Sequence, residues 1–107
     1  MRMTASVTQG LKAVSYTHLE RLGFDLVSTT LSGYTADTKD RALPDFELMR
    51  RLSRSLSIPV IGEGGIWSPE ELREAMEQGV FACVVGTAIT RPREITRRFV
   101  EAIKPAR

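Results

Sequence analysis

Apolar and polar residues alternate with two different periods along this chain from residue 23 onward. Three short apolar runs have the length and the β-branched content of buried strands. They are residues 24–29, 58–61 and 81–85. The longer stretch after each run repeats apolar residues every three or four positions, as one face of a helix does. The pattern therefore predicts three β-strands, each followed by an α-helix.

The helix expected after residue 68 has the clearest start. Ser68 precedes Pro69, and Glu71 follows three residues after the serine. This is the pattern of a capping box, in which the serine oxygen accepts a backbone N–H and the glutamate reaches back toward the cap. Gly79 is expected to end this helix in a left-handed conformation. Pro92 marks the start of the last helix in the same way.

Strands and helices that alternate at this spacing predict an α/β fold with a parallel sheet. A complete (β/α)8 barrel needs about 200 residues or more, and the chain has 107. Three parallel strands cannot close on themselves and would leave unpaired edges. The expected architecture is therefore a partial (β/α)8 TIM barrel of about three βα units.

Composition and charge argue against several classes of function. The net charge is +2 and the basic residues fall on amphipathic helical stretches, which argues against a nucleic-acid partner. No apolar stretch approaches the roughly 20 residues of a membrane span, so no membrane partner is expected. The chain has one cysteine, Cys83, and one histidine, His18, which argues against a disulfide framework and against a metal site. We expect a cytoplasmic protein.

In parallel α/β folds the functional loops follow the carboxyl ends of the strands. Two such loops are rich in glycine here. Glycine lets backbone N–H groups approach an anion closely, and a short helix after the third strand would point its positive end at it. The candidate phosphate-binding residues are Gly64, Gly65, Gly86 and Thr87. Tight βα turns use glycine as well, so the pattern alone does not decide between the two roles.

Glu63 is the most informative carboxylate, because it follows an apolar strand and stands between two glycines. A carboxyl group in such a strand mouth can exchange protons with a substrate, or it can cap a neighbouring backbone turn. Arg91 either clamps a phosphate or sugar oxygen or is an exposed arginine at a helix start. The loop after the first strand adds Thr30 as a candidate for substrate binding, and Tyr34 as a lid residue or a plain loop aromatic.

Two runs in the strand-end loops are specific enough to indicate a family. They are residues 29–35, Thr-Thr-Leu-Ser-Gly-Tyr-Thr, and residues 86–92, Gly-Thr-Ala-Ile-Thr-Arg-Pro. With them the chain resembles the N-acylglucosamine-6-phosphate 2-epimerase family, also called N-acetylmannosamine-6-phosphate epimerases, over roughly residues 23–103. The resemblance implies a (β/α)8 barrel that interconverts N-acetylmannosamine 6-phosphate and N-acetylglucosamine 6-phosphate by moving the proton at C2, in sialic acid catabolism. It also implies no metal or organic cofactor.

The resemblance assigns roles to several of the candidates. Glu63 matches the catalytic glutamate of the family, and Arg91 matches an arginine near the substrate. The backbones of Gly64, Gly86 and Thr87 match loops expected to hold the phosphate. The family pairs its glutamate with a lysine from an earlier strand, upstream of everything here. The chain thus resembles strands 6 to 8 of the barrel with a remnant of the fifth helix, and we expect it to be inactive by itself.

The first part of the chain departs from the family. We expect residues 23–107 to be the C-terminal part of a phosphate-binding barrel and residues 1–22 to be a degraded helix remnant. Residues 14–19, Val-Ser-Tyr-Thr-His-Leu, are interpreted as a foreign insertion, because removing them restores a helix of the expected length. Six extra residues would turn a helix by about 240° beyond whole turns and split its apolar face. A tolerated surface bulge is the alternative.

The expected partner is a small phosphosugar, together with either the missing N-terminal barrel half or a second copy of the chain. Two other functions stay open. One is a non-catalytic phosphosugar-binding or assembly half-barrel, and the other is a different isomerase built on a phosphate-binding barrel. Pairing of two copies ranks lower, because two sets of three strands fall short of an eight-stranded barrel.

Overall fold

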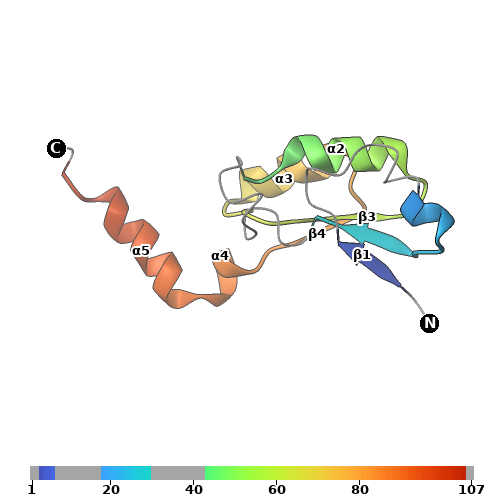
Figure 1. The fold of residues 1–107 in the computed structure, drawn as a ribbon. Coiled ribbons are helices and arrows are strands. Elements are labelled where there is room, and N and C mark those ends of the chain that lie inside the picture. The colour runs from blue at the N-terminus through green and yellow to red at the C-terminus, as the bar shows by residue number, and fades with distance from the viewer. Residues whose placement is uncertain (1–2, 7–17, 30–42, 106–107) are drawn as a thin grey trace.

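The computed structural model describes residues 3–6, 18–29 and 43–105. Four parallel strands form one sheet in the order β1-β2-β3-β4 (Figure 1). The strands are β1 (Thr4–Ser6), β2 (Leu26–Ser28), β3 (Val60–Glu63) and β4 (Ala82–Val84). Neighbouring strands in the sheet are therefore also neighbours along the sequence, which is the simplest order that right-handed βα crossovers produce.

Four helices follow the strands along the chain from residue 46 onward. They are α2 (Phe46–Ser55), α3 (Pro69–Glu77), α4 (Thr87–Thr90) and α5 (Pro92–Ala102). Both α2 and α3 lie over the same face of the sheet, whereas α4 and α5 continue beyond β4 and α5 extends away from the sheet (Figure 1). No residue of α5 is buried. Within the part of the chain that the structure describes, no helix is long and apolar enough to cross a bilayer.

The core lies between α2 and the sheet. Leu48, Met49 and Leu52 on α2 are fully buried, and so is Val27 at the centre of β2. Val27 pairs with Val60 of β3, so two β-branched residues stand side by side beneath the helix. Burying side chains of this size stabilises a fold by about 1.5–3 kcal/mol each. This packing fixes α2 against the middle of the sheet.

Side-chain caps set the starts of the two long central helices. Asp45 accepts the backbone N–H of Leu48 at 3.1 Å and begins α2. The Ser68 hydroxyl accepts the N–H of Glu71 at 3.1 Å, as the capping-box pattern predicts. The Glu71 carboxylate reaches one residue further back than expected and accepts the N–H of Trp67 at 2.6 Å. Both orphan donors at the start of α3 are thereby satisfied.

Gly79 has a φ of 96° directly after α3, which confirms the predicted left-handed end of that helix. The three predicted strands are present with slightly different limits. The second begins and ends two residues later than expected, so Glu63 is the last residue of β3 rather than part of the following loop. Pro59 lacks a backbone N–H, and the strand accordingly begins just after it.

Strand β1 is a feature that the apolar pattern did not predict. Its sequence is Thr-Ala-Ser, three small residues with no periodic signal, and it pairs with β2 along its whole length. The strand lies within the segment that we expected to be a helix remnant. Residues 18–21 of that segment are helical, whereas most of the interpreted insertion, residues 14–17, lies outside the described residues. Tertiary pairing with β2 therefore decides the structure of residues 4–6.

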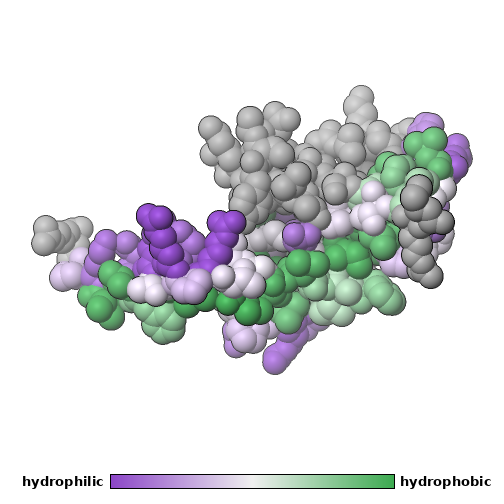
Figure 2. Space-filling view, turned by 90° about the horizontal axis from the view of Figure 1, so that it is seen from below, coloured by the Kyte–Doolittle hydropathy of each residue, from purple (hydrophilic) through white to green (hydrophobic). Residues whose placement is uncertain are grey.

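Among the residues that the structure describes, no helix covers the face of the sheet opposite α2. A Cβ added to Gly62 would lie 3.1 Å from the sulfur of Met49, so Gly62 faces α2. Because side chains alternate along a strand, Ile61 and Glu63 are on the opposite face. Viewed from that side, apolar residues gather along the sheet and continue onto α5 (Figure 2). Phe99 on α5 is 74% exposed, so the apolar surface extends well beyond the core.

Candidate active site

Glu63 stands at the carboxyl end of β3, where its backbone is held by one side chain from β2. The Thr29 hydroxyl donates to the carbonyl oxygen of Glu63 at 2.7 Å and accepts the N–H of Glu63 at 2.8 Å. Thr29 is fully buried, immediately after β2. On its other side Glu63 pairs with Val84 of β4. The carboxylate therefore projects from a backbone that is fixed from both neighbouring strands.

The chain turns sharply after Glu63. Gly64 and Gly65 have φ values of 108° and 75°, a region that side-chain-bearing residues rarely adopt. A Cβ on Gly65 would also lie 2.5 Å from the Cβ of Leu43. These two glycines are therefore needed by the turn itself, which is the structural role that the sequence left open for them. The turn follows Glu63 directly in the sequence.

A second loop that contains glycine follows the carboxyl end of the neighbouring strand, β4. Gly86 follows β4 and begins the short helix α4, where its carbonyl oxygen accepts the N–H of Ile89 at 2.8 Å. Because Glu63 pairs with Val84, the loops at residues 64–65 and 86–87 leave two neighbouring strands side by side. The predicted candidates Gly64, Gly65, Gly86 and Thr87 therefore follow the carboxyl ends of two neighbouring strands.

The reason for a glycine at position 86 differs from the reason at Gly64 and Gly65. Its φ is −112°, and a Cβ placed on it would meet no atom within 4 Å. Neither a positive φ nor crowding by the described residues explains a glycine there. Open space in front of a glycine at a strand end leaves room for a ligand to approach the backbone closely.

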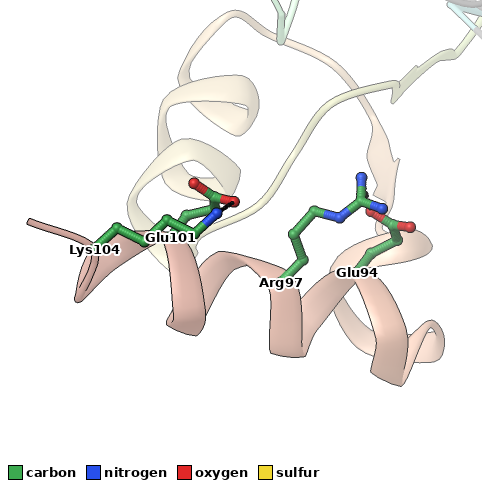
Figure 3. Close-up of polar contacts among 4 residues, drawn as sticks. All are labelled: Glu94, Arg97, Glu101 and Lys104. Atoms are coloured by element: carbon green, nitrogen blue, oxygen red, sulfur yellow. Dashed lines mark hydrogen bonds and ion pairs between the residues drawn. The ribbon is translucent and has the colours of Figure 1, made fainter.

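Arg91 joins α4 to α5 and is exposed. Its backbone N–H donates to the carbonyl oxygen of Thr87 at 3.3 Å, so it closes the single turn of α4. The next charged residues along the chain lie on α5, where Glu94 contacts Arg97 at 3.5 Å and Glu101 contacts Lys104 at 2.8 Å (Figure 3). Arg91 stands between α4 and α5, as the residue before the first turn of α5.

Lys104 is the one lysine among the described residues, and it does not belong to the strand end that carries Glu63. It lies after α5, exposed, and is paired with Glu101 (Figure 3). Lys12 and Lys39 lie outside the described residues, as do the candidate site residues Thr30 and Tyr34. The described residues hold no cluster of three or more histidine, cysteine or acidic side chains that could bind a metal ion.

A cavity of about 360 Å³ lies between the loop after β3 and the last two helices. It is lined by Trp67, Ala88, Ile95, Arg98, Phe99 and Ala102. The Arg98 guanidinium stacks over the Trp67 ring, 4.4 Å from the ring centre. This cation–π contact links α5 to the loop that also carries Gly64 and Gly65. Trp67 therefore packs against Arg98 of α5.

The Cys83 side chain does not contribute to the candidate site. Its sulfur would lie 3.2 Å from a Cβ on Gly62, on the helix-covered side, and its thiol contacts the sulfur of Met76 at 3.7 Å. Burial raises the pKa of the Cys83 thiol, and a backbone hydrogen bond from Gly62 partly offsets that rise. A thiol held in its neutral form is a poor nucleophile.

Thr29 is the functional residue that the sequence did not single out. It was read as the last β-branched residue of a strand, and its neighbour Thr30 was the candidate instead. A threonine at the carboxyl end of a strand has a signal of its own, because its hydroxyl can replace a backbone partner where the ladder stops. That signal is too common in strands to identify a site without the register of β2 against β3.

Comparison with known proteins identifies a family over nearly the whole chain. The model of the family described as "Putative N-acetylmannosamine-6-phosphate epimerase" matches residues 7–105. A relative from Caldanaerobacter subterraneus subsp. tengcongensis, named "Putative N-acetylmannosamine-6-phosphate 2-epimerase", is 60% identical over 88 residues, which is 82% of this chain and 37% of the relative. The chain therefore spans well under half the length of this relative.

Solved structures agree with the sequence match. The N-acetylmannosamine-6-phosphate 2-epimerase from Clostridium perfringens superimposes with a TM-score of 0.82 at 45% identity, covering 95% of this chain and 43% of that one. The YdjI aldolase from Escherichia coli K12 superimposes with a TM-score of 0.60 at 18% identity, and the match covers 98% of this chain and 39% of the aldolase chain. At this identity the match supports the fold alone. These neighbours are TIM-barrel proteins, so the predicted partial barrel and the predicted family are confirmed.

Proposed function

Because the chain belongs to the N-acetylmannosamine-6-phosphate epimerase family, we propose that it is the part of a C2 epimerase that supplies Glu63 and the phosphate-binding loops. The substrate pair is N-acetylmannosamine 6-phosphate and N-acetylglucosamine 6-phosphate, which differ in configuration at C2. The observation that carries this proposal is the position of Glu63. It ends β3, directly before Gly64 and Gly65, and pairs with Val84 of β4, the strand that precedes Gly86.

The reaction needs two groups that exchange protons with C2 from opposite faces of the sugar. In the open-chain form C2 is next to the aldehyde, so loss of its proton gives an enolate whose negative charge rests on the carbonyl oxygen. The Glu63 carboxylate accepts the C2 proton in one direction of the reaction and, as the acid, returns one in the other. A second group on the opposite face completes the inversion. The proton balance closes without a redox step.

The two glycine loops bind the phosphate and fix the sugar relative to Glu63. Gly64, Gly65, Gly86 and Thr87 follow the carboxyl ends of β3 and β4, which are neighbouring strands, so their backbone N–H groups are available at one end of the sheet. Such N–H groups favour an anion over a neutral group. The open space in front of Gly86 is where the phosphate approaches most closely. Holding the far end of the substrate in this way converts binding energy into orientation at C2.

Arg91 supplies a positive charge at the same edge, toward the phosphate or an oxygen of the sugar. Thr30 and Tyr34 follow Thr29 in the sequence and lie outside the described residues. We assign both to substrate binding on the strength of their position in the sequence. No metal or organic cofactor enters this scheme.

The second proton-transfer group comes from a part of the barrel that these strands do not supply. Lys104 is paired with Glu101 beyond α5 and cannot serve from there. The strands of an eight-stranded barrel direct their carboxyl ends to one common face, so a lysine on an added strand would reach the same substrate as Glu63. The chain is then one half of an active site, inactive alone and active with the rest of the barrel.

Reconstitution tests this proposal. The chain is assayed for conversion of N-acetylmannosamine 6-phosphate alone, and again after co-purification with the part of the Clostridium perfringens epimerase that the match does not cover. We expect no conversion by the chain alone and conversion by the complex. A stable complex without activity would contradict the proposal. Conversion by the chain alone would contradict the division of the active site.

A binding or assembly role is the second candidate, and the number of strands favours it more than the sequence did. The sheet has four parallel strands with both β1 and β4 at open edges. Two copies would together provide the eight strands of a closed barrel. This candidate predicts a dimer in sedimentation velocity that binds N-acetylglucosamine 6-phosphate without converting it. A monomer at all concentrations would exclude it.

A further inference from the structure

We propose that Thr29 is a positioning residue for Glu63, fixing the backbone from which the carboxylate reaches the substrate. This inference rests on the proposed function for its catalytic consequence. Its structural part, the control of Glu63 by Thr29, stands on the geometry alone. The two residues come from different strands and are 34 positions apart in the sequence.

The hydroxyl of Thr29 replaces a backbone partner at the point where the β2–β3 ladder ends. The N–H of Thr29 still donates to the carbonyl oxygen of Ile61 at 3.1 Å, as in a parallel ladder. The next ladder bond would join the N–H of Glu63 to a carbonyl oxygen of β2. That N–H instead donates to the Thr29 hydroxyl at 2.8 Å, and the hydroxyl proton points to the Glu63 carbonyl oxygen at 2.7 Å.

One hydroxyl therefore satisfies both the donor and the acceptor of the same residue. A hydroxyl has one donor and two acceptor positions, so it is the smallest side-chain group that can do this. Thr29 is fully buried, and its β-branched side chain has few rotamers available. The bridge is consequently rigid, and water does not compete for it.

This bridge matters because Glu63 is followed by two residues without side chains. Gly64 and Gly65 turn the chain through positive φ values and restrain Glu63 less than ordinary residues would. The Thr29 bridge holds the backbone just before that turn. Without it the strand would end earlier and the carboxylate would lose its fixed starting point. A displacement of about 1 Å at a catalytic group can lower a rate by about a hundredfold.

Two substitutions and a control test the inference in the full chain. Thr29→Val keeps the shape but removes both hydrogen bonds, whereas Thr29→Ser keeps the hydroxyl. Thr4→Val is the matched control, since it changes an exposed threonine on β1. Amide hydrogen exchange at Glu63, followed by NMR, is expected to accelerate at least tenfold in Thr29→Val. It should stay within about threefold of wild type in Thr29→Ser and in Thr4→Val. Unchanged exchange in Thr29→Val would overturn the proposal.

A measurement on the wild-type chain covers the case in which Thr29→Val does not fold. A bridging hydroxyl proton is shielded from water and gives a resolved NMR signal with a nuclear Overhauser contact to the Glu63 N–H. The absence of that contact in the folded chain would overturn the proposal without any variant.

The catalytic consequence is measured in the reconstituted complex. Thr29→Val is expected to lower kcat about 10- to 100-fold with KM within threefold of wild type, and Thr29→Ser to restore most of kcat. An equal loss in the serine variant would contradict a positioning role. If the wild-type complex converts no substrate, the proposed function fails, and the exchange experiment still decides whether Thr29 controls Glu63.

Discussion

Gly65 and Leu43 touch where the chain turns after β3. A Cβ added to Gly65 would lie 2.5 Å from the Leu43 Cβ, and the φ of Gly65 is 75°. We therefore predict that Gly65→Ala lowers the free energy of unfolding by about 2–4 kcal/mol, from the left-handed backbone and the collision together. Urea denaturation followed by circular dichroism measures this. A loss below about 0.5 kcal/mol, the scale of a neutral surface change, would show that the turn rearranges freely.

Gly86→Ala should lower the affinity for the substrate but leave the stability unchanged, in contrast to Gly65→Ala. A Cβ at Gly86 meets no atom within 4 Å and its φ is negative, so the stability should change by less than about 0.5 kcal/mol. The added methyl group would occupy the space in which the phosphate approaches the backbone. We predict a loss of affinity of about tenfold for N-acetylglucosamine 6-phosphate in the reconstituted complex, measured by calorimetry. Unchanged affinity would place the phosphate elsewhere.

The core beneath α2 should be far more sensitive than the apolar surface of α5. Leu52 is fully buried against the sheet, and Leu52→Ala is expected to cost about 2–5 kcal/mol of unfolding free energy. Ile103 is 82% exposed, and Ile103→Ala should change the stability by less than about 0.5 kcal/mol. Thermal denaturation of both variants provides the comparison. Equal losses would mean that α5 packs against the core in solution.

The Cys83 thiol should make stability fall in alkaline solution. Burial raises its pKa in the folded chain, so the folded state keeps the proton at a pH where the unfolded chain, with a pKa of about 8.5, has lost it. Its contribution to stability is complete below about pH 8.5 and is lost as the pH rises through the higher folded value. Cys83→Ala should flatten this part of the pH profile, as measured by urea denaturation between pH 7 and pH 10. An identical profile in the variant would contradict the assignment.

The sequence could predict those parts of the fold that depend on local signals. Ser68 and Glu71 predicted the start of α3, and Gly79 predicted its end, because helix caps depend on residues within one turn of each other. Strand β1 has no comparable signal, since three small residues become a strand only by pairing with β2. Strand limits moved by one or two residues for the same reason.

The candidate site was predictable in composition but not in geometry. Glu63 and the glycine loops stood out because they follow apolar strands, and the register Glu63↔Val84 then brings the two loops together. The sequence could not separate the roles of the glycines. Gly65 is required by its own turn, whereas Gly86 faces open space. The bridge from Thr29 depends on the relative register of two strands, which no local pattern specifies.

Deuterium incorporation at C2 tests the central claim most directly, namely that Glu63 is one half of an acid–base pair. N-acetylmannosamine 6-phosphate is incubated in deuterated buffer with the reconstituted complex, carrying wild-type Glu63, Glu63→Gln, or Glu47→Gln as the matched control at an exposed glutamate of α2. We predict deuterium at C2 with wild type and with Glu47→Gln, and a rate at least a hundredfold lower with Glu63→Gln. A Glu63→Gln complex that exchanges within tenfold of wild type would contradict the account.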